Sequence, residues 1–166
     1  MCITMIFVVL GSQKFQFDRL LKKIDSLKSA GKIKEEIIAQ IGYSNYRPSS
    51  FENFDFIEKE MFDQYIEKAD TIICHGGTGV IITALKKGKK VIAIPRDSKY
   101  GEHVDDHQFQ IVALFSKLNY LEALYDVDDL EKVLYRSKQK KYRTFQSTNA
   151  VFVNELRKDI EKIGKR

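Results

Sequence analysis

The residues best suited to chemistry form a glycine-rich turn after an apolar run. Residues 71–74 are β-branched or apolar, and a helical pattern begins near residue 78. The turn between them is His75, Gly76, Gly77, Thr78 and Gly79. A strand, a glycine turn and a helix start present bare backbone N–H groups and the positive end of a helix to a phosphate. Thr78 or Thr83 could add hydroxyl contacts, although such a turn can also be a plain strand-to-helix connection.

A second polar cluster follows the next apolar strand. Residues 90–95 lead into Arg96, and the polar stretch after it contains Glu102, His103, Asp106 and Gln108. In an open parallel sheet, ligands bind beyond the carboxyl ends of the strands. Both clusters follow such ends, so we expect them to share one crevice. All three histidines of the chain, His75, His103 and His107, fall in these clusters.

The alternation of strand-like and helical patterns predicts an α/β fold with an open parallel sheet. We expect strands over 5–10, 36–41, 54–58, 71–74, 91–94 and 121–125. We expect helices over 17–30, 59–68, 78–87, 104–117, 128–135 and about 149–163. The last helix is amphipathic, so its apolar face could pack on its own domain or dock on another chain. With 166 residues, the chain is expected to be a single domain, 1–166.

Composition and charge exclude several classes of protein. No collagenous or low-complexity segment occurs, and the apolar opening is too short for a membrane span and is expected to be a strand. Cys2 and Cys74 are expected to be buried reduced thiols, typical of a cytosolic protein. The net charge of +5 is modest, and no nucleic-acid-binding motif is present. The densest basic run, Arg136 to Arg143, is interpreted as a solvated loop or as a lipid or partner contact.

The chain resembles the glycosyltransferase family 28 C-terminal domain, the nucleotide-sugar-binding half of two-lobed GT-B glycosyltransferases. Three stretches carry this resemblance: 75–79, 89–96 and 102–108. The chain is also similar to stand-alone catalytic subunits of two-component enzymes. These are the bacterial exopolysaccharide and capsule subunits (PssE-like, or β-1,4-galactosyltransferase-like) and the dolichol-pathway N-acetylglucosaminyltransferase subunit. The resemblance implies a Rossmann-like sheet with helices on both faces.

The resemblance also implies roles for individual residues. Gly76, Gly77, Thr78 and Gly79, with His75 beside them, would bind the donor diphosphate. Asp106 and Gln108 would contact the hydroxyls of the donor sugar, and the strand end at Arg96 would border the base. Gly11 and Ser12 would face the cleft where an acceptor arrives. At the position of Thr83, many relatives have a glutamate that binds the ribose hydroxyls. The expected contact with the ribose therefore departs from the family pattern in this chain.

The implied activity is an inverting hexosyl transfer, with galactose favoured, from a UDP-sugar to a lipid-linked saccharide in exopolysaccharide or capsule biosynthesis. A membrane-associated partner subunit would carry the acceptor site, which would place this chain in the cytoplasm, peripheral at the inner face of the membrane. No cofactor and no nucleic acid are implied. Amides and a helix dipole can stabilise the leaving group without a metal. A base is also needed, and Glu102, His103 or the partner could supply it.

Two other functions stay open at this point. His103 and His107 are four residues apart, hence on one face of the expected helix, and with His75 and Asp106 they could bind zinc. A non-catalytic nucleotide-binding regulatory module would use the same glycine turn. A dehydrogenase fits less well, because the residues after the first strand lack the dinucleotide-binding glycine pattern.

Overall fold

Six parallel strands form one open sheet in the computed structural model, which describes residues 3–146, 157–158 and 161. The strands are β1 (Met5–Val9), β2 (Glu36–Gln40), β3 (Glu52–Phe54), β4 (Thr71–His75), β5 (Lys90–Ile94) and β6 (Glu122–Ala123). The helices are α1 (Asp18–Ser29), α2 (Lys59–Lys68), α3 (Thr78–Lys86), α4 (His107–Lys117) and α5 (Leu130–Gln139), with 3-10 turns η1 (Ser98–Tyr100) and η2 (Val127–Asp129). The strand order is β3-β2-β1-β4-β5-β6, so the predicted parallel α/β fold is confirmed.

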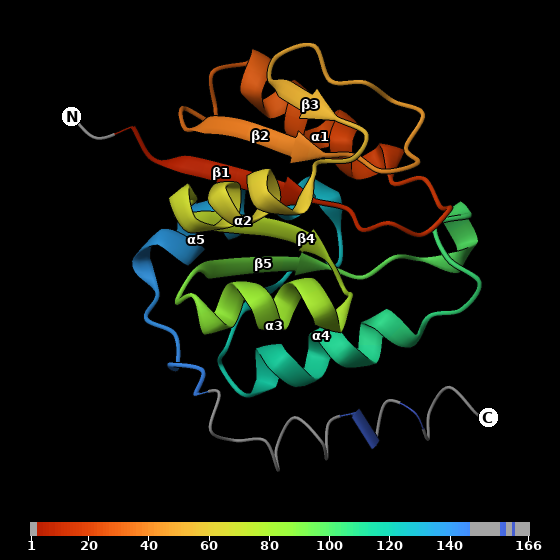
Figure 1. The fold of residues 1–166 in the computed structure, drawn as a ribbon, viewed down its shortest axis with the longest axis vertical. Helices are drawn as coiled ribbons and strands as arrows, with labels where there is room; N and C mark the ends of the chain where they lie inside the picture. The colour runs from red at the N-terminus through yellow and green to blue at the C-terminus, as the bar shows by residue number, and fades with distance from the viewer. Residues whose placement is uncertain (1–2, 147–156, 159–160, 162–166) are drawn as a thin grey trace.

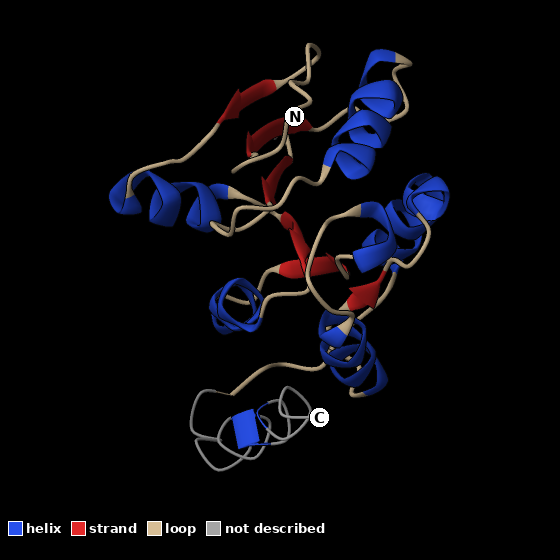
Figure 2. Cartoon of the chain, turned by 90° about the vertical axis from the view of Figure 1, so that its right-hand side faces the viewer, coloured by secondary structure: helices blue, strands red, loops and turns tan. Residues whose placement is uncertain are grey.

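Helices cover both faces of the sheet, as Figures 1 and 2 show. Successive side chains of a strand point to opposite faces, so Phe7 of β1 joins one core cluster while Ile6 and Val8 join the other. The cluster with Phe7 includes residues of α2, α3 and α4. The cluster with Ile6 and Val8 includes residues of α1 and α5. The central strands are therefore apolar on both faces, which explains their continuous apolar sequence.

Helix α4 begins at His107, three residues later than the start at 104 that the sequence predicted. The Oδ1 atom of Asp105 accepts the N–H of His107 at 3.1 Å, and this local bond competes with a helical turn. His103 therefore lies in the turn before α4. The prediction that His103 and His107 share one helical face is wrong.

The edges of the sheet also differ from the sequence prediction. The third strand is Glu52–Phe54, because Glu52 pairs with Ile38 and Phe54 with Gln40. The apolar alternation at 54–58, which suggested a strand there, belongs mostly to the connection to α2. The sixth strand shrinks to two residues, Glu122–Ala123.

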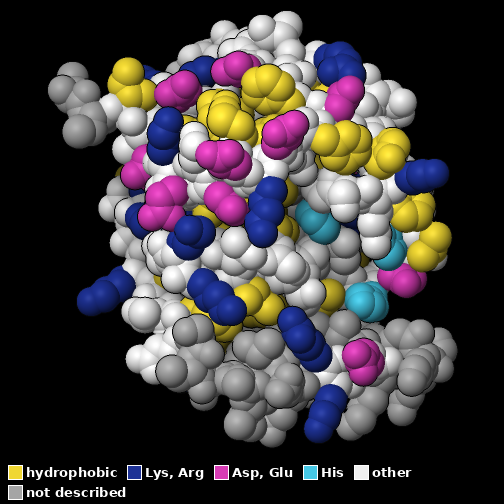
Figure 3. All heavy atoms as spheres, viewed as in Figure 1, with side chains coloured by type: hydrophobic (Ala, Val, Ile, Leu, Met, Phe, Trp, Pro, Cys, Tyr) yellow, Lys and Arg dark blue, Asp and Glu magenta, His cyan; other side chains and the backbone are white. Residues whose placement is uncertain are grey.

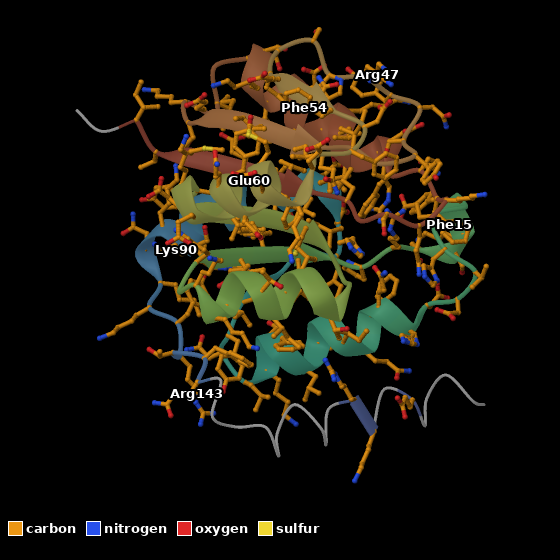
Figure 4. The ribbon with its side chains drawn as sticks, in the orientation of Figure 1. Phe15, Arg47, Phe54, Glu60, Lys90 and Arg143 are labelled. Carbon is orange, nitrogen blue, oxygen red and sulfur yellow. The ribbon has the colours of Figure 1, made fainter. Side chains whose placement is uncertain are left out.

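The basic run from Arg136 to Arg143 is not simply a solvated loop. Its first residues extend α5 to Gln139. Arg136 and Lys140 both form ion pairs with the buried carboxylate of Glu122, at 2.7 and 3.0 Å. Figure 4 shows Lys90 and Arg143 near this region, at the end of the sheet opposite to Phe15. Part of the run therefore neutralises a buried acid.

Further predictions concern the two cysteines and the C-terminal helix. Cys74 is buried and free, as predicted, and burial raises the pKa of its thiol. Cys2 and almost all of the predicted helix at 149–163 lie outside the described residues. No helix among the described residues is long and apolar enough to cross a membrane.

Candidate functional site

The candidate site lies where the connections of two neighbouring strands diverge. After β1 the chain turns toward α1 and β2, whereas after β4 it turns toward α3 and β5, on the other side of the sheet. Such a topological switch point leaves a crevice beyond the carboxyl ends of the strands. Gly11 follows β1, and Gly76 and Gly77 follow β4. Figure 3 shows the three histidines, in cyan, gathered on this side of the molecule, as the sequence predicted.

The glycine turn opens directly into α3. Gly77 is the N-cap residue, no side chain caps the helix, and no acidic residue lies in its first turn. The first N–H groups of a helix have no intrahelical partner and carry the positive end of the helix dipole. A Cβ built on Gly79 would meet no atom of the described residues within 4 Å outside the backbone of its own helix, so open space lies beside this residue. The N–H groups at this end of the helix can therefore donate to an anionic oxygen.

Thr83 lies one turn further along α3. Its hydroxyl donates to the carbonyl oxygen of Gly79 at 2.8 Å. That bond uses the hydroxyl proton and leaves a lone pair for a donor on a ligand. Thr83 can therefore offer one acceptor where many relatives are expected to offer a carboxylate.

His75 ends β4 and its ring is enclosed by glycine backbone. A Cβ on Gly11 would lie 2.7 Å from Nε2 of His75, and one on Gly77 would lie 2.2 Å from its Cε1. Gly11 also has φ +80°, a conformation that favours glycine. Burial, together with the positive charge of Arg96, lowers the pKa of His75 to about 4. The imidazole is therefore neutral at pH 7.

Gln108, in the first turn of α4, is buried between the two polar clusters. Its Oε1 accepts the backbone N–H of Gly76 at 3.0 Å and that of Arg96 at 3.1 Å. Its Nε2 lies 3.3 Å from Nδ1 of His75. One side chain thus joins the loops that follow β4 and β5, as expected from a shared crevice.

Arg96 points into the protein, with only 2% of its surface exposed. Its guanidinium donates to the backbone carbonyl oxygens of Leu10, Phe15, Gln16 and Glu102. Burial lowers its pKa to about 10, which still leaves it charged at neutral pH. The side chain of Arg96 therefore holds the loop after β1 against the end of β5, while its backbone N–H is held by Gln108.

Glu102 is fully buried beneath the same loops. Its two carboxylate oxygens accept from Nε and Nη2 of Arg19 at 2.6 and 3.1 Å, and one also accepts the N–H of Asp97 at 2.9 Å. A carboxylate that accepts hydrogen bonds from a guanidinium and a backbone N–H holds the segments that donate them in place. This geometry favours a supporting role, and participation of Glu102 in catalysis stays a prediction.

The remaining predicted residues lie at the rim of the crevice. Nε2 of His103 is 3.0 Å from Oε1 of Gln13, and its ring lies 5.3 Å from that of Phe15. Asp106 is exposed and its Oδ1 accepts the N–H of Ser98 at 3.0 Å. This hydrogen bond lowers the pKa of Asp106. Ser12 is exposed in the turn after Gly11. His103 and the turn after β1 are therefore neighbours.

Arg19, Gln13 and Phe15 contribute to this region but were missed by sequence reasoning. Arg19 is 83 residues from Glu102 in the chain, so no local spacing connects them. The one available signal was indirect, because a buried glutamate requires a cation or several donors. The partner itself can be identified only from the folded chain.

A cavity of about 770 Å³ lies on the α1 side of the same edge and is lined by residues of α1, η1 and η2, together with Glu102. Its acidic groups are already engaged: Asp18 accepts from the amides of Asn45 and Tyr46, and Asp128 pairs with Lys23. We therefore place the candidate site at the glycine turn, where no side chain of the described residues caps the start of α3. Among the described residues, no three His, Cys, Asp or Glu side chains gather to hold a metal, so the zinc alternative gains no support.

Comparison with known proteins agrees with this geometry. The family model "Glycosyltransferase family 28 C-terminal domain" matches residues 5–163. The chain is 33% identical over 116 residues to the UDP-N-acetylglucosamine transferase subunit ALG13 of Candida albicans, covering 69% of this chain and 38% of that protein. It is 28% identical over 107 residues to ALG13 of Homo sapiens, covering 59% of this chain and 9% of that protein. The chain thus spans less than half of the length of these curated relatives.

Solved structures share the fold at low sequence identity. The solution structure of an ALG13 matches with a TM-score of 0.62 at 20% identity, covering 93% of this chain and 94% of that chain. The glycotransferase of kitacinnamycin matches with a TM-score of 0.62 at 17% identity, covering 95% of this chain and 38% of the other. The chain therefore belongs to the glycosyltransferase family 28 C-terminal domain family and has the fold of the C-terminal half of a GT-B glycosyltransferase.

Proposed function

We propose that this chain is the donor-binding catalytic subunit of an inverting glycosyltransferase that moves a hexose from a UDP-sugar. The observation that carries the proposal is the uncapped N-terminus of α3, which opens at the β1–β4 switch point beside Gly76, Gly77 and Gly79. Its free amides would bind the pyrophosphate of the donor. The same groups would stabilise the charge that develops on the leaving diphosphate.

Other residues of the crevice would bind the rest of the donor. Thr83 would accept a hydrogen bond from the ribose, since its own proton is used by Gly79. The backbone at Arg96 would border the base, and the exposed carboxylate of Asp106 would accept from a sugar hydroxyl. The turn at Gly11 and Ser12 would face the acceptor.

We further propose His103 as the candidate base on this chain. It lies at the rim of the crevice beside the turn after β1, where an acceptor hydroxyl would arrive. Its Nε2 faces the amide oxygen of Gln13 and its Nδ1 accepts the N–H of Asp105, so one of these bonds would have to be exchanged before the ring takes a proton. Glu102 would act indirectly, by holding Arg19 and the amide of Asp97 in place. A base from the partner subunit is the other source that this chemistry allows.

The acceptor would be a lipid-linked saccharide, presented by a membrane-associated partner subunit in exopolysaccharide or capsule biosynthesis. This partner would keep the chain at the inner face of the cell membrane. The word "subunit" in the names of the ALG13 relatives supports the need for a partner. We expect the isolated chain to have weak or no transfer activity, and co-expression with its membrane partner to restore it. Full turnover by the isolated chain on a soluble acceptor would contradict this part of the proposal.

The donor is tested by thermal unfolding of the isolated chain with a panel of nucleotide sugars. The resemblance to bacterial subunits favours UDP-galactose, whereas the names of the ALG13 relatives favour UDP-N-acetylglucosamine. A ligand present at about 100 times its Kd stabilises the folded state by about 2.7 kcal/mol, so the preferred donor should give the largest shift. UDP-glucose, UDP-glucuronate and an ADP-sugar complete the panel. No shift with any UDP-sugar would contradict the proposed function.

A further inference from the structure

The side-chain amide of Gln108 has only one orientation that satisfies its surroundings. Its Oε1 faces two backbone donors, the N–H groups of Gly76 and Arg96, at 3.0 and 3.1 Å. Reversing the amide would place an NH₂ group against both donors. The oxygen is therefore fixed toward the backbone, and Nε2 is fixed toward His75.

This orientation determines where His75 carries its proton. An amide nitrogen can only donate, so Nδ1 of His75, at 3.3 Å, has to be the acceptor. A neutral imidazole that accepts at Nδ1 carries its hydrogen on Nε2. The low pKa of His75, caused by burial and by the nearby Arg96 charge, keeps the ring in this neutral form.

The N–H of Nε2 lies at the switch point of the sheet. The ring lies between Gly11 and Gly77, where a Cβ on either residue would contact it. Nε2 makes no hydrogen bond with any described residue, whereas Nδ1 is engaged by Gln108. A fixed, neutral donor thus stands next to the free amides at the start of α3.

We propose that Gln108 is a positioning residue that locks His75 in the Nε2–H tautomer, so that this N–H donates to an oxygen of the donor's pyrophosphate. The pyrophosphate part rests on the proposed function, whereas the tautomer part stands on the geometry alone. The inference differs from the role that the family resemblance implies for Gln108, which is contact with the sugar hydroxyls. Gln108 instead acts through His75 on the diphosphate.

The tautomer is measured by ¹⁵N NMR of the imidazole side chains in the ligand-free protein. The chain has only three histidines, so assignment is direct. We expect Nδ1 of His75 to be bare and Nε2 protonated. In Gln108→Glu the second carboxylate oxygen can only accept, so Nδ1 should gain a proton. The control is Gln110→Glu, which adds the same charge at an exposed position of the same helix and should change nothing. A wild-type His75 protonated on Nδ1, or a mixture of tautomers, overturns the proposal even if the variants do not fold.

Binding of UDP and of UDP-sugars to Gln108→Met separates the two possible roles of this residue. If Gln108 acts through His75, UDP and the preferred UDP-sugar should both lose affinity by the same factor, about twofold to tenfold for one weakened hydrogen bond. Gln110→Met should bind like the wild type. A loss seen with the UDP-sugar but not with UDP would place Gln108 on the sugar and overturn the proposal. If the wild type binds neither ligand, the proposed function and the pyrophosphate part fail together, while the NMR result still decides the tautomer part.

Discussion

Breaking the ion pair between Arg19 and Glu102 should lower the free energy of unfolding strongly, and Arg19→Met tests this. Glu102 is fully buried, and the variant leaves its carboxylate with the N–H of Asp97 and the positive charge of the nearby Arg96. Breaking one partner of a buried pair costs about 3–5 kcal/mol. Because the Arg19 side chain is 21% exposed and one donor remains, we expect a loss near the lower end, about 3 kcal/mol. The free energy of unfolding in urea measures it.

The same helix provides a matched control. Lys23 also pairs across to a carboxylate, that of Asp128, but the Asp128 side chain is 79% exposed. Lys23→Met should therefore cost no more than about 1 kcal/mol. Adding Glu102→Gln to Arg19→Met should recover part of the loss, because the buried charge is then removed. Equal losses for Arg19→Met and Lys23→Met would refute the conclusion that Glu102 is held as a structural carboxylate.

Three further predictions concern the glycine turn and pH. Gly77→Ala should lower the melting temperature, because its Cβ would lie 2.2 Å from Cε1 of His75. Gly79→Ala should leave the melting temperature unchanged, because its Cβ would meet no atom of the described residues within 4 Å outside its own helix backbone. Gly79→Ala should still weaken UDP binding in calorimetry if the ligand occupies that space. Because the pKa of His75 falls to about 4 on folding, the unfolded chain binds more protons between about pH 6.5 and 4. As the pH is lowered from about 6.5 to 4, the free energy of unfolding should therefore decrease. In urea titrations, His75→Gln should make the free energy of unfolding less dependent on pH across this window. Burial alone would raise the pKa of Asp25, but hydrogen bonds, chiefly from Ser50, outweigh it and lower the pKa below 3.8. The stability that this carboxylate contributes is complete above pH 3.8 and lost in stronger acid. Asp25→Asn should therefore lower the free energy of unfolding at neutral pH and weaken its dependence on pH below 3.8.

The central strands could be predicted because their side chains are buried on both faces of the sheet. Phe7 and Val8 of β1 are fully buried in opposite clusters, so the apolar run had to be an interior strand. α2 was predicted to the residue, since its amphipathic pattern is complete within 59–68. The shared crevice also followed from the sequence, because the carboxyl ends of parallel strands lie at one edge.

The parts that sequence reasoning missed depend on contacts between distant residues. The late start of α4 results from a side-chain bond of Asp105, which competes with helix formation locally. The position of β3 depends on its register against β2, which the alternation of Phe54 and Phe56 could not specify. The side chain of Arg96 donates to four carbonyl oxygens inside the fold, and no spacing in the sequence indicated these contacts.

The central claim is that a nucleotide diphosphate binds to the backbone amides at the start of α3. Backbone ¹H–¹⁵N NMR of the isolated chain, titrated with UDP, tests it most directly. We expect the largest shift changes at the amides of Gly77, Thr78 and Gly79, which start α3, with a matching change at Nε2 of His75. Changes concentrated instead on the basic segment at 138–143, or spread evenly over the surface, would contradict it.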